Sequence, residues 1–121
     1  MAKLDHDEVL EDLADELAEG LAEGERICTN PGPEHNCGIK GLYPDLIVAR
    51  KKKALRIYEV ETEDSMNDVA QWENYAALGV PFTLIIPAEK LDVAEGLLDE
   101  HGIEADIMTY ELDDDGDIVF E

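Results

Sequence analysis

Residues 43–62, YPDLIVARKKKALRIYEVET, decide the fold of this chain. The runs YPDLIVA (residues 43–49) and LRIYEVET (residues 55–62) are rich in β-branched and apolar side chains. The basic stretch RKKKA separates them, and this pattern predicts an antiparallel hairpin. Both runs are apolar on their two faces, which is typical of central strands covered on both sides of a sheet. We therefore expect this hairpin in the middle of an α/β domain.

Three acidic residues interrupt these apolar strands. Glu59 and Glu61 project from the same face of their strand, because successive side chains alternate between faces. If the hairpin turns about Lys52, Asp45 lies opposite Glu59, and the three carboxylates lie within a few ångströms of one another. Acids near strand ends are also commonly no more than exposed edge residues, and that alternative stays open for each of the three.

A cluster of carboxylates inside a covered sheet needs a compensating cation. Each carboxylate loses hydration on burial and raises the pKa of its neighbours. Mg²⁺, or Mn²⁺ in its place, prefers oxygen ligands and commonly combines one or two carboxylates with water and a substrate phosphate. A metal ion held in this way polarises a phosphoryl group and generates hydroxide near neutral pH, which phosphodiester hydrolysis requires.

The motif GLYPD (residues 41–45), followed by EVE (residues 59–61) and then by a helix and a strand, resembles the PD-(D/E)XK nuclease superfamily. This superfamily includes restriction endonucleases, Holliday-junction resolvases and RecB-type exonucleases. The resemblance covers roughly residues 8–110. It implies a three-layer, restriction-endonuclease-like α/β fold with a mixed central sheet flanked by helices, and a metal-dependent nuclease whose partner is DNA. The metal-site residues that it implies are Asp45, Glu59 and Glu61.

The segment QWENYAAL (residues 71–78) resembles the RecB-type motif in which a glutamine is followed four residues later by a tyrosine, here Gln71 and Tyr75. Residues four apart share a helix face, so the resemblance implies that both side chains orient the substrate. The alternative for Tyr75 is ordinary packing of the helix against the core.

The chain departs from the superfamily at Glu61, which stands where a lysine is usual. Lysine there helps to position the attacking water and neutralises charge on the phosphorane, and Glu61 cannot supply a positive charge. Some restriction enzymes of the superfamily carry Glu at this position and remain active, so we expect Glu61 to bind the metal or to act as a general base. Lys40 is the candidate for a relocated lysine. On the first helix, one of Glu8, Glu11 and Glu16 is a candidate for a further ligand.

The remaining sequence predicts helices and strands around this hairpin, in one domain over residues 1–121. Leucines spaced three and four apart predict a first helix over residues 5–24, and the segment 28–38, rich in Pro, Gly and Asn, predicts an irregular loop. The elements predicted after the hairpin are a helix from Ser65 to Gly79, a strand over residues 80–86, a helix that follows Pro87 and stops near Gly102, and a terminal hairpin of residues 105–112 and 117–120.

The charge of the chain bears on its partners. The chain has 121 residues and a formal net charge of −22, which by itself argues against a nucleic-acid partner. Residues 40–90, however, hold seven of the nine basic residues and eight acids, so the flanks carry almost all of the net charge. An acidic shell suited to high salt explains this distribution, and so do acidic flanks that mimic or repel nucleic acid.

The sequence also bears on location and assembly. No apolar run approaches the length of a membrane span, and the first residues lack the apolar core of a secretion signal, so we expect a cytoplasmic protein without membrane partners. So small a domain offers little surface for gripping duplex DNA, which favours a homodimer or a larger complex.

Two interpretations from other classes stay open. A catalytically silent module of the same fold would bind a protein partner through its acidic flanks, and the missing lysine and the net charge favour it. The weaker alternative is a zinc-stabilised structural protein built on Cys28, His35 and Cys37. Its fourth ligand would be His6 or His101, which are otherwise expected at the surface. Two reduced thiols are the simpler expectation for the cysteines of a cytoplasmic protein.

Overall fold

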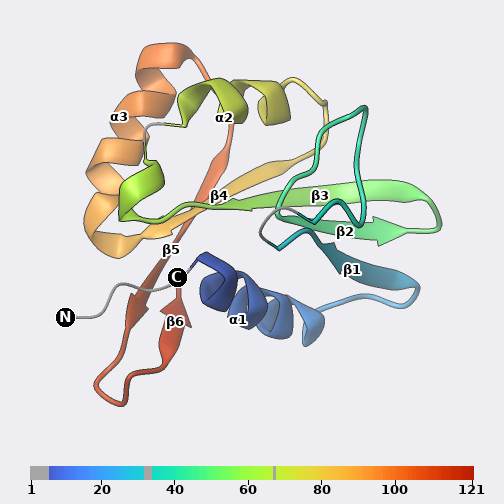
Figure 1. Cartoon of the computed structure of the whole chain (residues 1–121), viewed down its shortest axis with the longest axis horizontal. Coiled ribbons are helices and arrows are strands. Elements are labelled where there is room, and N and C mark those ends of the chain that lie inside the picture. The colour runs from blue at the N-terminus through green and yellow to red at the C-terminus, as the bar shows by residue number, and fades with distance from the viewer. Residues whose placement is uncertain (1–5, 32–33, 67) are drawn as a thin grey trace.

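The computed structural model of the chain describes residues 6–31, 34–66 and 68–121. Over these residues, three α-helices and six strands form a mixed α/β structure around one twisted sheet (Figure 1). None of these helices combines the length and the apolar composition needed to cross a membrane. The elements are α1 (His6–Ala18), β1 (Glu25–Thr29), β2 (Leu46–Arg50), β3 (Lys53–Val60), the 3-10 helix η1 (Glu63–Ser65), α2 (Val69–Ala76), β4 (Phe82–Pro87), the 3-10 helix η2 (Ala88–Lys90), α3 (Leu91–His101), β5 (Asp106–Leu112) and β6 (Ile118–Phe120).

The strands lie in the sheet in the order in which they occur in the chain, from β1 to β6. β1, β2 and β3 are antiparallel, β3, β4 and β5 are parallel, and β6 returns antiparallel to β5. The two parallel connections run through α2 and α3. Because such crossovers share one handedness and here advance in the same direction, both helices cover the same face, and α1 covers the other (Figure 1).

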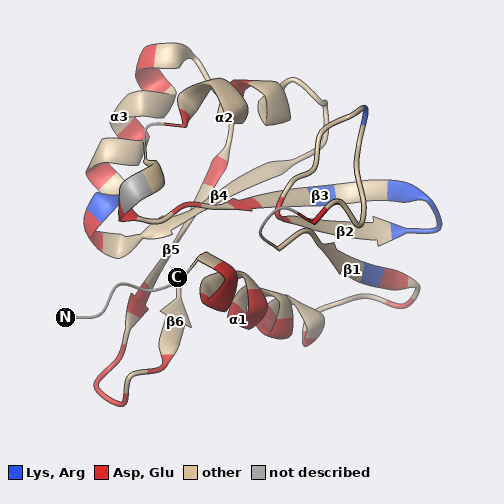
Figure 2. Ribbon diagram, viewed as in Figure 1, with Lys and Arg blue, Asp and Glu red and all other residues tan. Residues whose placement is uncertain are grey.

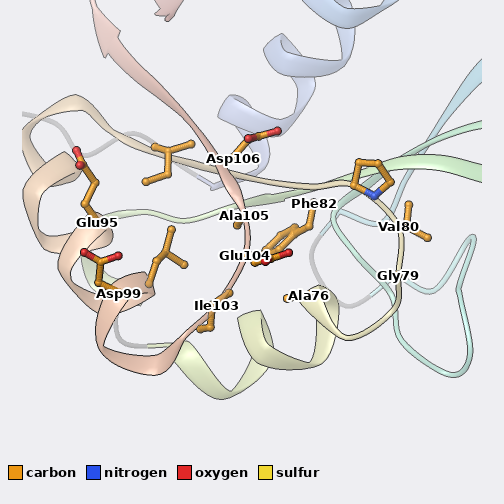
Figure 3. A pocket seen from close by; sticks show the side chains of 13 residues that line it. Ala76, Gly79, Val80, Phe82, Glu95, Asp99, Ile103, Glu104, Ala105 and Asp106 are labelled. Atoms are coloured by element: carbon orange, nitrogen blue, oxygen red, sulfur yellow. The ribbon is translucent and has the colours of Figure 1, made fainter.

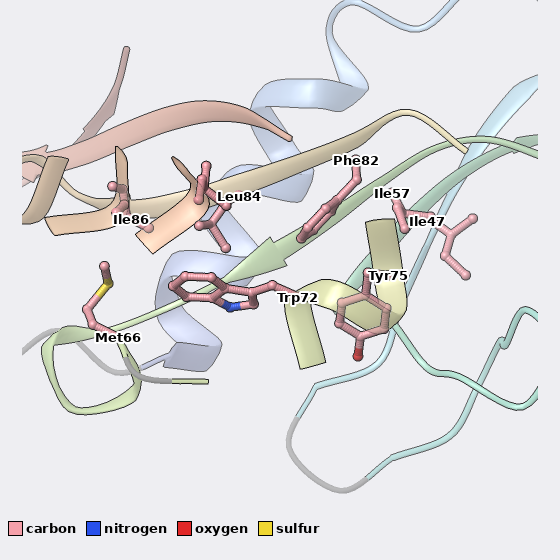
Figure 4. Close-up of a cluster of buried hydrophobic side chains, with 10 residues drawn as sticks. Ile47, Ile57, Met66, Trp72, Tyr75, Phe82, Leu84 and Ile86 are labelled. Carbon is pink, nitrogen blue, oxygen red and sulfur yellow. The ribbon is translucent and has the colours of Figure 1, made fainter. Parts of the chain in front are cut away.

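An apolar layer lies on each face of the sheet. Side chains of β3 enter both layers in alternation: Ile57 faces α2 and α3, whereas Tyr58 faces α1. The hairpin strands are thus covered on both sides, as their continuous apolar runs predict. The buried layer under α2 and α3, drawn in Figure 4, consists of Ile47, Ile57, Met66, Trp72, Tyr75, Phe82, Leu84, Ile86, Ala94 and Leu98. The layer under α1 consists of Val9, Leu10, Leu13, Leu46, Val48, Tyr58, Val60, Ile85 and Tyr110.

The predicted hairpin is present, with a shifted turn. Its register changes by one residue at an irregularity between Val48 and Ala49, where a bulge interrupts the regular pairing. The turn therefore occupies positions 51 and 52 and is not centred on one residue. On the sheet side of the bulge, Leu46 pairs with Tyr58. Continued by one residue, this register places Asp45 opposite Glu59.

Several boundaries differ from their predictions, as in α2, which begins at Val69 and not at Ser65. The first helix ends at Ala18 and not at residue 24, because Gly20 and Gly24 weaken a helix there. Its predicted start at residue 5 lies outside the described residues, as do residues 32, 33 and 67 of the later segments. The segment 28–38, predicted as an irregular loop, begins with the end of β1. This strand is short, lies at the sheet edge and is only partly apolar, so its sequence carries a weak strand pattern.

Cys28 and Cys37 form a disulfide, with their Cα atoms 6.5 Å apart. The expectation of reduced thiols is therefore wrong. The zinc site built on these cysteines and His35 is wrong as well, because each sulfur atom is bonded to the other and the His35 ring stacks on Tyr43. The cysteines meet because the segment after β1 folds back on the end of that strand, where the side chain of Asn36 donates a hydrogen bond to the carbonyl oxygen of Thr29.

Candidate metal centre at the end of the β2–β3 hairpin

Asp45 and Glu59 adjoin where the hairpin meets the rest of the sheet. Asp45 precedes β2 and Glu59 is the penultimate residue of β3, so the register described above sets them opposite each other. The backbone N–H of Asp45 donates to Glu59 Oε1 at 3.1 Å, and the N–H of Val60 donates to Asp45 Oδ2 at 2.8 Å. The two residues are 9% and 4% exposed. Backbone hydrogen bonds from the two strands therefore fix both carboxylates.

Glu61 extends this acidic group along the end of β3. It is 2% exposed, and its backbone N–H donates to the carbonyl oxygen of Ile85 at 2.8 Å. Its Oε2 atom and Trp72 Nε1 are both buried, and neither makes a hydrogen bond of regular geometry with the described residues. The Trp72 N–H group nevertheless lies close enough to the Glu61 carboxylate to lower its pKa. Burial raises the pKa of Glu61 to about 7, opposed by the Ser65 hydroxyl group. A buried carboxylate oxygen without a regular hydrogen bond is costly unless a cation lies against it.

Electrostatic repulsion links the acids of the site. Burial, followed by the negative charge of Asp45, raises the pKa of Glu59 well above its usual value, and the charge of Glu61 raises it further. Bringing these carboxyl groups together thus disfavours their ionised forms relative to their protonated forms, as expected for carboxylates that share a buried site. The carboxylates of Asp45, Glu59 and Glu61 do not lie close enough together for all three to bind one metal ion in this arrangement. In the described part of the chain, the acids with three ligand atoms within 4.8 Å of one another are Asp113, Asp115 and Asp117.

His6, the first residue of α1, completes the arrangement. Its Nε2 atom lies 2.9 Å from Asp45 Oδ2, and its Nδ1 atom lies 3.0 Å from Asp7 Oδ1. The hydrogen bond to Asp45 raises the pKa of His6 to about 9, even though burial opposes the charged form. At neutral pH the imidazole is therefore protonated and donates to Asp45. The sequence-based expectation that His6 is a surface residue without a partner is wrong.

The first helix meets the site through its first residue, not through its acids. Glu8, Glu11 and Glu16 are exposed, because the buried face of α1 is formed by other residues. Sequence spacing alone could not identify His6, which is 39 residues from Asp45 and meets it only after α1 docks on the sheet. The sequence feature that could have indicated His6 as a site residue is its position at the polar start of an amphipathic helix.

Gln71 and Tyr75 lie on α2, which covers the face of the sheet from which Glu59 projects. In the amide orientation that satisfies both of its groups, Gln71 donates to Glu59 Oε2 at 3.2 Å and to Asp68, and accepts from Tyr75 Oη at 2.9 Å. Tyr75 is 2% exposed and its ring packs edge-on against Phe82 (Figure 4). Burial raises the pKa of Tyr75. The ring of Tyr75 packs in the core, as the alternative interpretation expects, and its hydroxyl group contacts Gln71. A role for Tyr75 in orienting a substrate stays a prediction.

The basic residues near the site in the sequence are exposed or pair with another strand. Lys40 is an exposed residue of the loop between β1 and β2, and residues 51–53 are exposed at the far tip of the hairpin. Two arginines of the hairpin pair with Glu25 on β1: Arg50 Nη2 lies 3.7 Å, and Arg56 Nη2 3.5 Å, from its carboxylate. His6 is thus the cation that contacts Asp45 in the described part of the chain.

Two other features lie away from this centre. Asp113, Asp115 and Asp117 are exposed in the β5–β6 turn, and the backbone N–H groups of the last two donate to Asp113 Oδ1. An open pocket of about 730 Å³ lies between α2, α3 and the starts of β4 and β5 (Figure 3). Its lining combines an apolar floor with acids such as Glu95 and Asp99, and includes none of the predicted site residues.

Comparison with known proteins gives limited results. No family model matches the sequence. No curated protein matches it either. Among solved structures, the chain is similar to SfsA of Pyrococcus furiosus in complex with Ca²⁺, with 14% sequence identity and a TM-score of 0.48. The similarity covers 96% of this chain and 61% of that protein, so the chain spans less than two thirds of its length.

Proposed function

We propose that the chain is a metal-dependent phosphodiester hydrolase of the PD-(D/E)XK type that acts on DNA, with Asp45 and Glu59 as the principal ligands of Mg²⁺ or Mn²⁺. The observation that carries the proposal is the pair of buried carboxylates, Asp45 and Glu59, fixed by backbone hydrogen bonds at one end of the hairpin. A divalent cation would compensate this charge directly, because hard cations prefer oxygen ligands.

The order of the elements supports the same proposal. Strands β1, β2 and β3 form an antiparallel meander, with Asp45 just before β2 and with Glu59 and Glu61 at the end of β3. Helix α2 then connects β3 to the parallel strand β4. This is the order that the sequence resemblance implies for a restriction-endonuclease-like fold. Asp45, Glu59 and Glu61 thus lie at one end of two adjacent strands, and in this proposal one metal ion binds Asp45 and Glu59.

The residues around the metal would divide the remaining chemistry. Bound there, the metal would polarise a phosphoryl group and lower the pKa of a bound water. Glu61, whose pKa is about 7, is suited to accept a proton near neutral pH. Gln71 donates a hydrogen bond to Glu59 and accepts one from Tyr75. Gln71 and Tyr75 would therefore orient the Glu59 carboxylate that binds the metal and, through the metal, the substrate.

His6 would supply the positive charge that Glu61 cannot. Its imidazolium lies against Asp45 and is partly exposed, with 32% of the side chain accessible. A cation in this position would attract the substrate phosphate and stabilise negative charge that develops during hydrolysis. In this proposal His6, and not Lys40, takes the electrostatic role of the lysine that is usual in the superfamily.

A divalent-metal-dependent cleavage assay tests the function. Single-stranded, duplex and branched DNA, together with RNA, would be incubated with the whole chain and Mg²⁺ or Mn²⁺ at low and high salt. We expect cleavage that falls in Asp45→Asn and Glu59→Gln by more than the roughly 10- to 100-fold that loss of a supporting group costs. Calorimetric titration should show the same two variants losing the metal.

The matched control is Asp115→Asn in the exposed β5–β6 turn, which also removes a carboxylate but lies in the other acidic cluster. It should cleave like the parent chain. Metal-dependent cleavage that survives Asp45→Asn, or disappears in Asp115→Asn, would place the catalytic metal elsewhere.

A catalytically silent module that binds a protein partner is the second candidate. The occupation of Asp45 by His6 and the acidic surfaces of α1 and α3 favour it (Figure 2). In that case the parent chain would cleave none of these substrates with any divalent ion or salt concentration, and the site would contribute only to the fold.

A further inference from the structure

A pair of stacked aromatic rings lies on the surface beside the candidate metal centre. The rings of His35 and Tyr43 are parallel to within 7°, with centroids 3.9 Å apart. His35 is exposed, and Tyr43 is 38% exposed. Neither ring has a role in the hydrolysis proposed above. Exposed aromatic rings of this kind bind nucleobases, because every base has a π face.

The backbone keeps the Tyr43 ring in place. A Cβ atom at Gly38 would lie only 2.8 Å from Tyr43 Cε1 and 3.0 Å from the carbonyl oxygen of Leu42, so glycine is required for this close approach. The phenol ring therefore rests against the Gly38 backbone and against the ring of His35. Among the described residues His35 is exposed.

The loop that carries both rings is held at several points. The side-chain amide of Asn30, which is 3% exposed, donates to the carbonyl oxygens of Cys37 and Pro44, each at 2.7 Å. Its Oδ1 atom accepts from the backbone N–H groups of Asn36 and Cys37. The disulfide from Cys37 to Cys28 ties the same segment to β1. A ring pair on so constrained a loop is organised before a ligand arrives, which reduces the entropy lost on binding.

The ring pair is connected directly to the acids of the site. Tyr43 lies two residues before Asp45, and two residues span at most about 7 Å. The carbonyl oxygen of Tyr43 lies 3.4 Å from Tyr75 Oη, which contacts Gln71 and through it Glu59. A base stacked on the pair would therefore be held by the loop that leads directly into Asp45.

The charge around the loop suits an anionic strand. Residues 25–56 carry seven basic and three acidic side chains, a net charge of +4 in a chain whose total is −22. Lys40 belongs to the same loop, and further basic residues gather at the hairpin end, whereas acids follow α1 and α3 (Figure 2). A polyanion would thus approach the molecule from the β1–β3 end, on which this loop lies.

We infer that the His35–Tyr43 pair is a stacking site for an unpaired base, and that the substrate is single-stranded DNA or a frayed DNA end. The inference rests on the proposed function of the metal centre and names its substrate class. Base pairs inside a duplex cannot stack on His35, because their faces are already covered by neighbouring pairs.

Fluorescence anisotropy with a labelled single-stranded oligothymidylate, measured without divalent metal, tests the site separately from hydrolysis. We expect His35→Ala to weaken binding about 5- to 150-fold, which corresponds to one base–aromatic contact. His35→Trp should restore binding. Affinity for a blunt duplex should not change. The matched control is His101→Ala, which removes another partly exposed histidine, paired with Glu73 on α2. Circular dichroism and thermal unfolding would show that each variant is folded.

The outcomes separate the two proposals. If the parent chain cleaves DNA but His35→Ala binds single strands as tightly as the parent, the stacking site is wrong and the nuclease stands. Equal losses for single strands and duplex, or no binding of single strands by the parent chain, also overturn the stacking site. Ring-dependent binding of single strands without cleavage by the parent chain supports the stacking site and contradicts hydrolysis.

Discussion

The contact between His6 and Asp45 brings a cation and a candidate metal ligand together at the edge of the site. The two side chains are 32% and 12% exposed, so their attraction is weakened less by solvent than that of a surface pair. A divalent metal that binds Asp45 Oδ2 would compete with the His6 proton for the same oxygen. The metal-free state of the site is therefore sensitive to pH.

We expect the metal-free protein to lose stability as the pH rises from about 5 to 9. The pKa of Glu61 rises from 4.5 to about 7 on folding, so its proton stabilises the folded state at low pH. That contribution, of the order of 3 kcal/mol, disappears between these values. The pKa of His6 rises from 6.5 to about 9, and its contribution, fully present below 6.5, disappears as the pH passes 9.

Urea unfolding at several pH values, with chelator present, measures this dependence. Glu61→Gln should flatten the profile between about pH 4.5 and 7, and His6→Asn should flatten it between about pH 6.5 and 9. A stability that is constant over this range, or that increases with pH, would show that neither group carries a proton into the folded state.

At the residue scale, alternation along the strands predicts which acids share a face of the sheet, but it does not predict how closely their carboxylates pack. Asp45 and Glu59 follow from the pairing of two apolar runs, and the buried Glu61 follows from the period of two. The contact of His6 with Asp45 depends on how α1 docks across the sheet, and the hydrogen bond of Gln71 to Glu59 depends on side-chain rotamers of α2. Local sequence patterns do not determine either of these.

Among the elements, the segment between β1 and β2 depends most on a covalent cross-link. Its described residues, 30–31 and 34–45, form no regular strand or helix. The Cys28–Cys37 disulfide and the Asn30 side chain hold its first half. We expect the double variant Cys28→Ser, Cys37→Ser to unfold with a free energy about 2–4 kcal/mol lower than the parent, because its unfolded chain is no longer constrained.

Urea unfolding with and without reductant provides the measurement. Reductant should lower the midpoint of the parent chain towards that of the double variant, and should leave the double variant unchanged as the control. A parent chain whose midpoint does not respond to reductant would mean that the cross-link contributes nothing to stability.

The elements differ in how far their sequences reveal them. Apolar runs and helical spacing predict the central hairpin, β4 and α3 because burial imposes those patterns. β1 is an edge strand and needs little apolar surface, so its sequence resembles a loop. The disulfide depends on the path of that loop, and a spacing of nine residues does not specify such a path.

Over the whole molecule, charge is unevenly distributed, with basic residues at the hairpin end and acids over the helices (Figure 2). A net charge of −22 on 121 residues repels itself in the compact state. The order of the sheet follows from short connections between successive elements, and its mixed direction was predictable. The face on which α1 lies was not, because the amphipathic pattern of a helix does not identify the side of the sheet it will cover.

We expect the thermal stability of the whole chain to increase with NaCl concentration, with most of the increase reached by about 1 M, where the Debye length falls to about 3 Å. Each kcal/mol gained should raise Tm by about 4 °C in a domain of this size. A triple variant, Glu8→Gln, Glu11→Gln and Glu16→Gln, should melt at a higher temperature in low salt and respond less to NaCl. A Tm that falls as salt is added would contradict a role for self-repulsion.

The bulge between Val48 and Ala49 separates the hairpin into two parts that are aligned independently. The inner part is fixed by burial on both faces, whereas the exposed outer part is fixed by its own two-residue turn. Residues 51 and 52 thus offer an attachment point for a fluorophore or an immobilising tag. Labelling there would report on encounters with a ligand while leaving the alignment of Asp45 and Glu59 undisturbed.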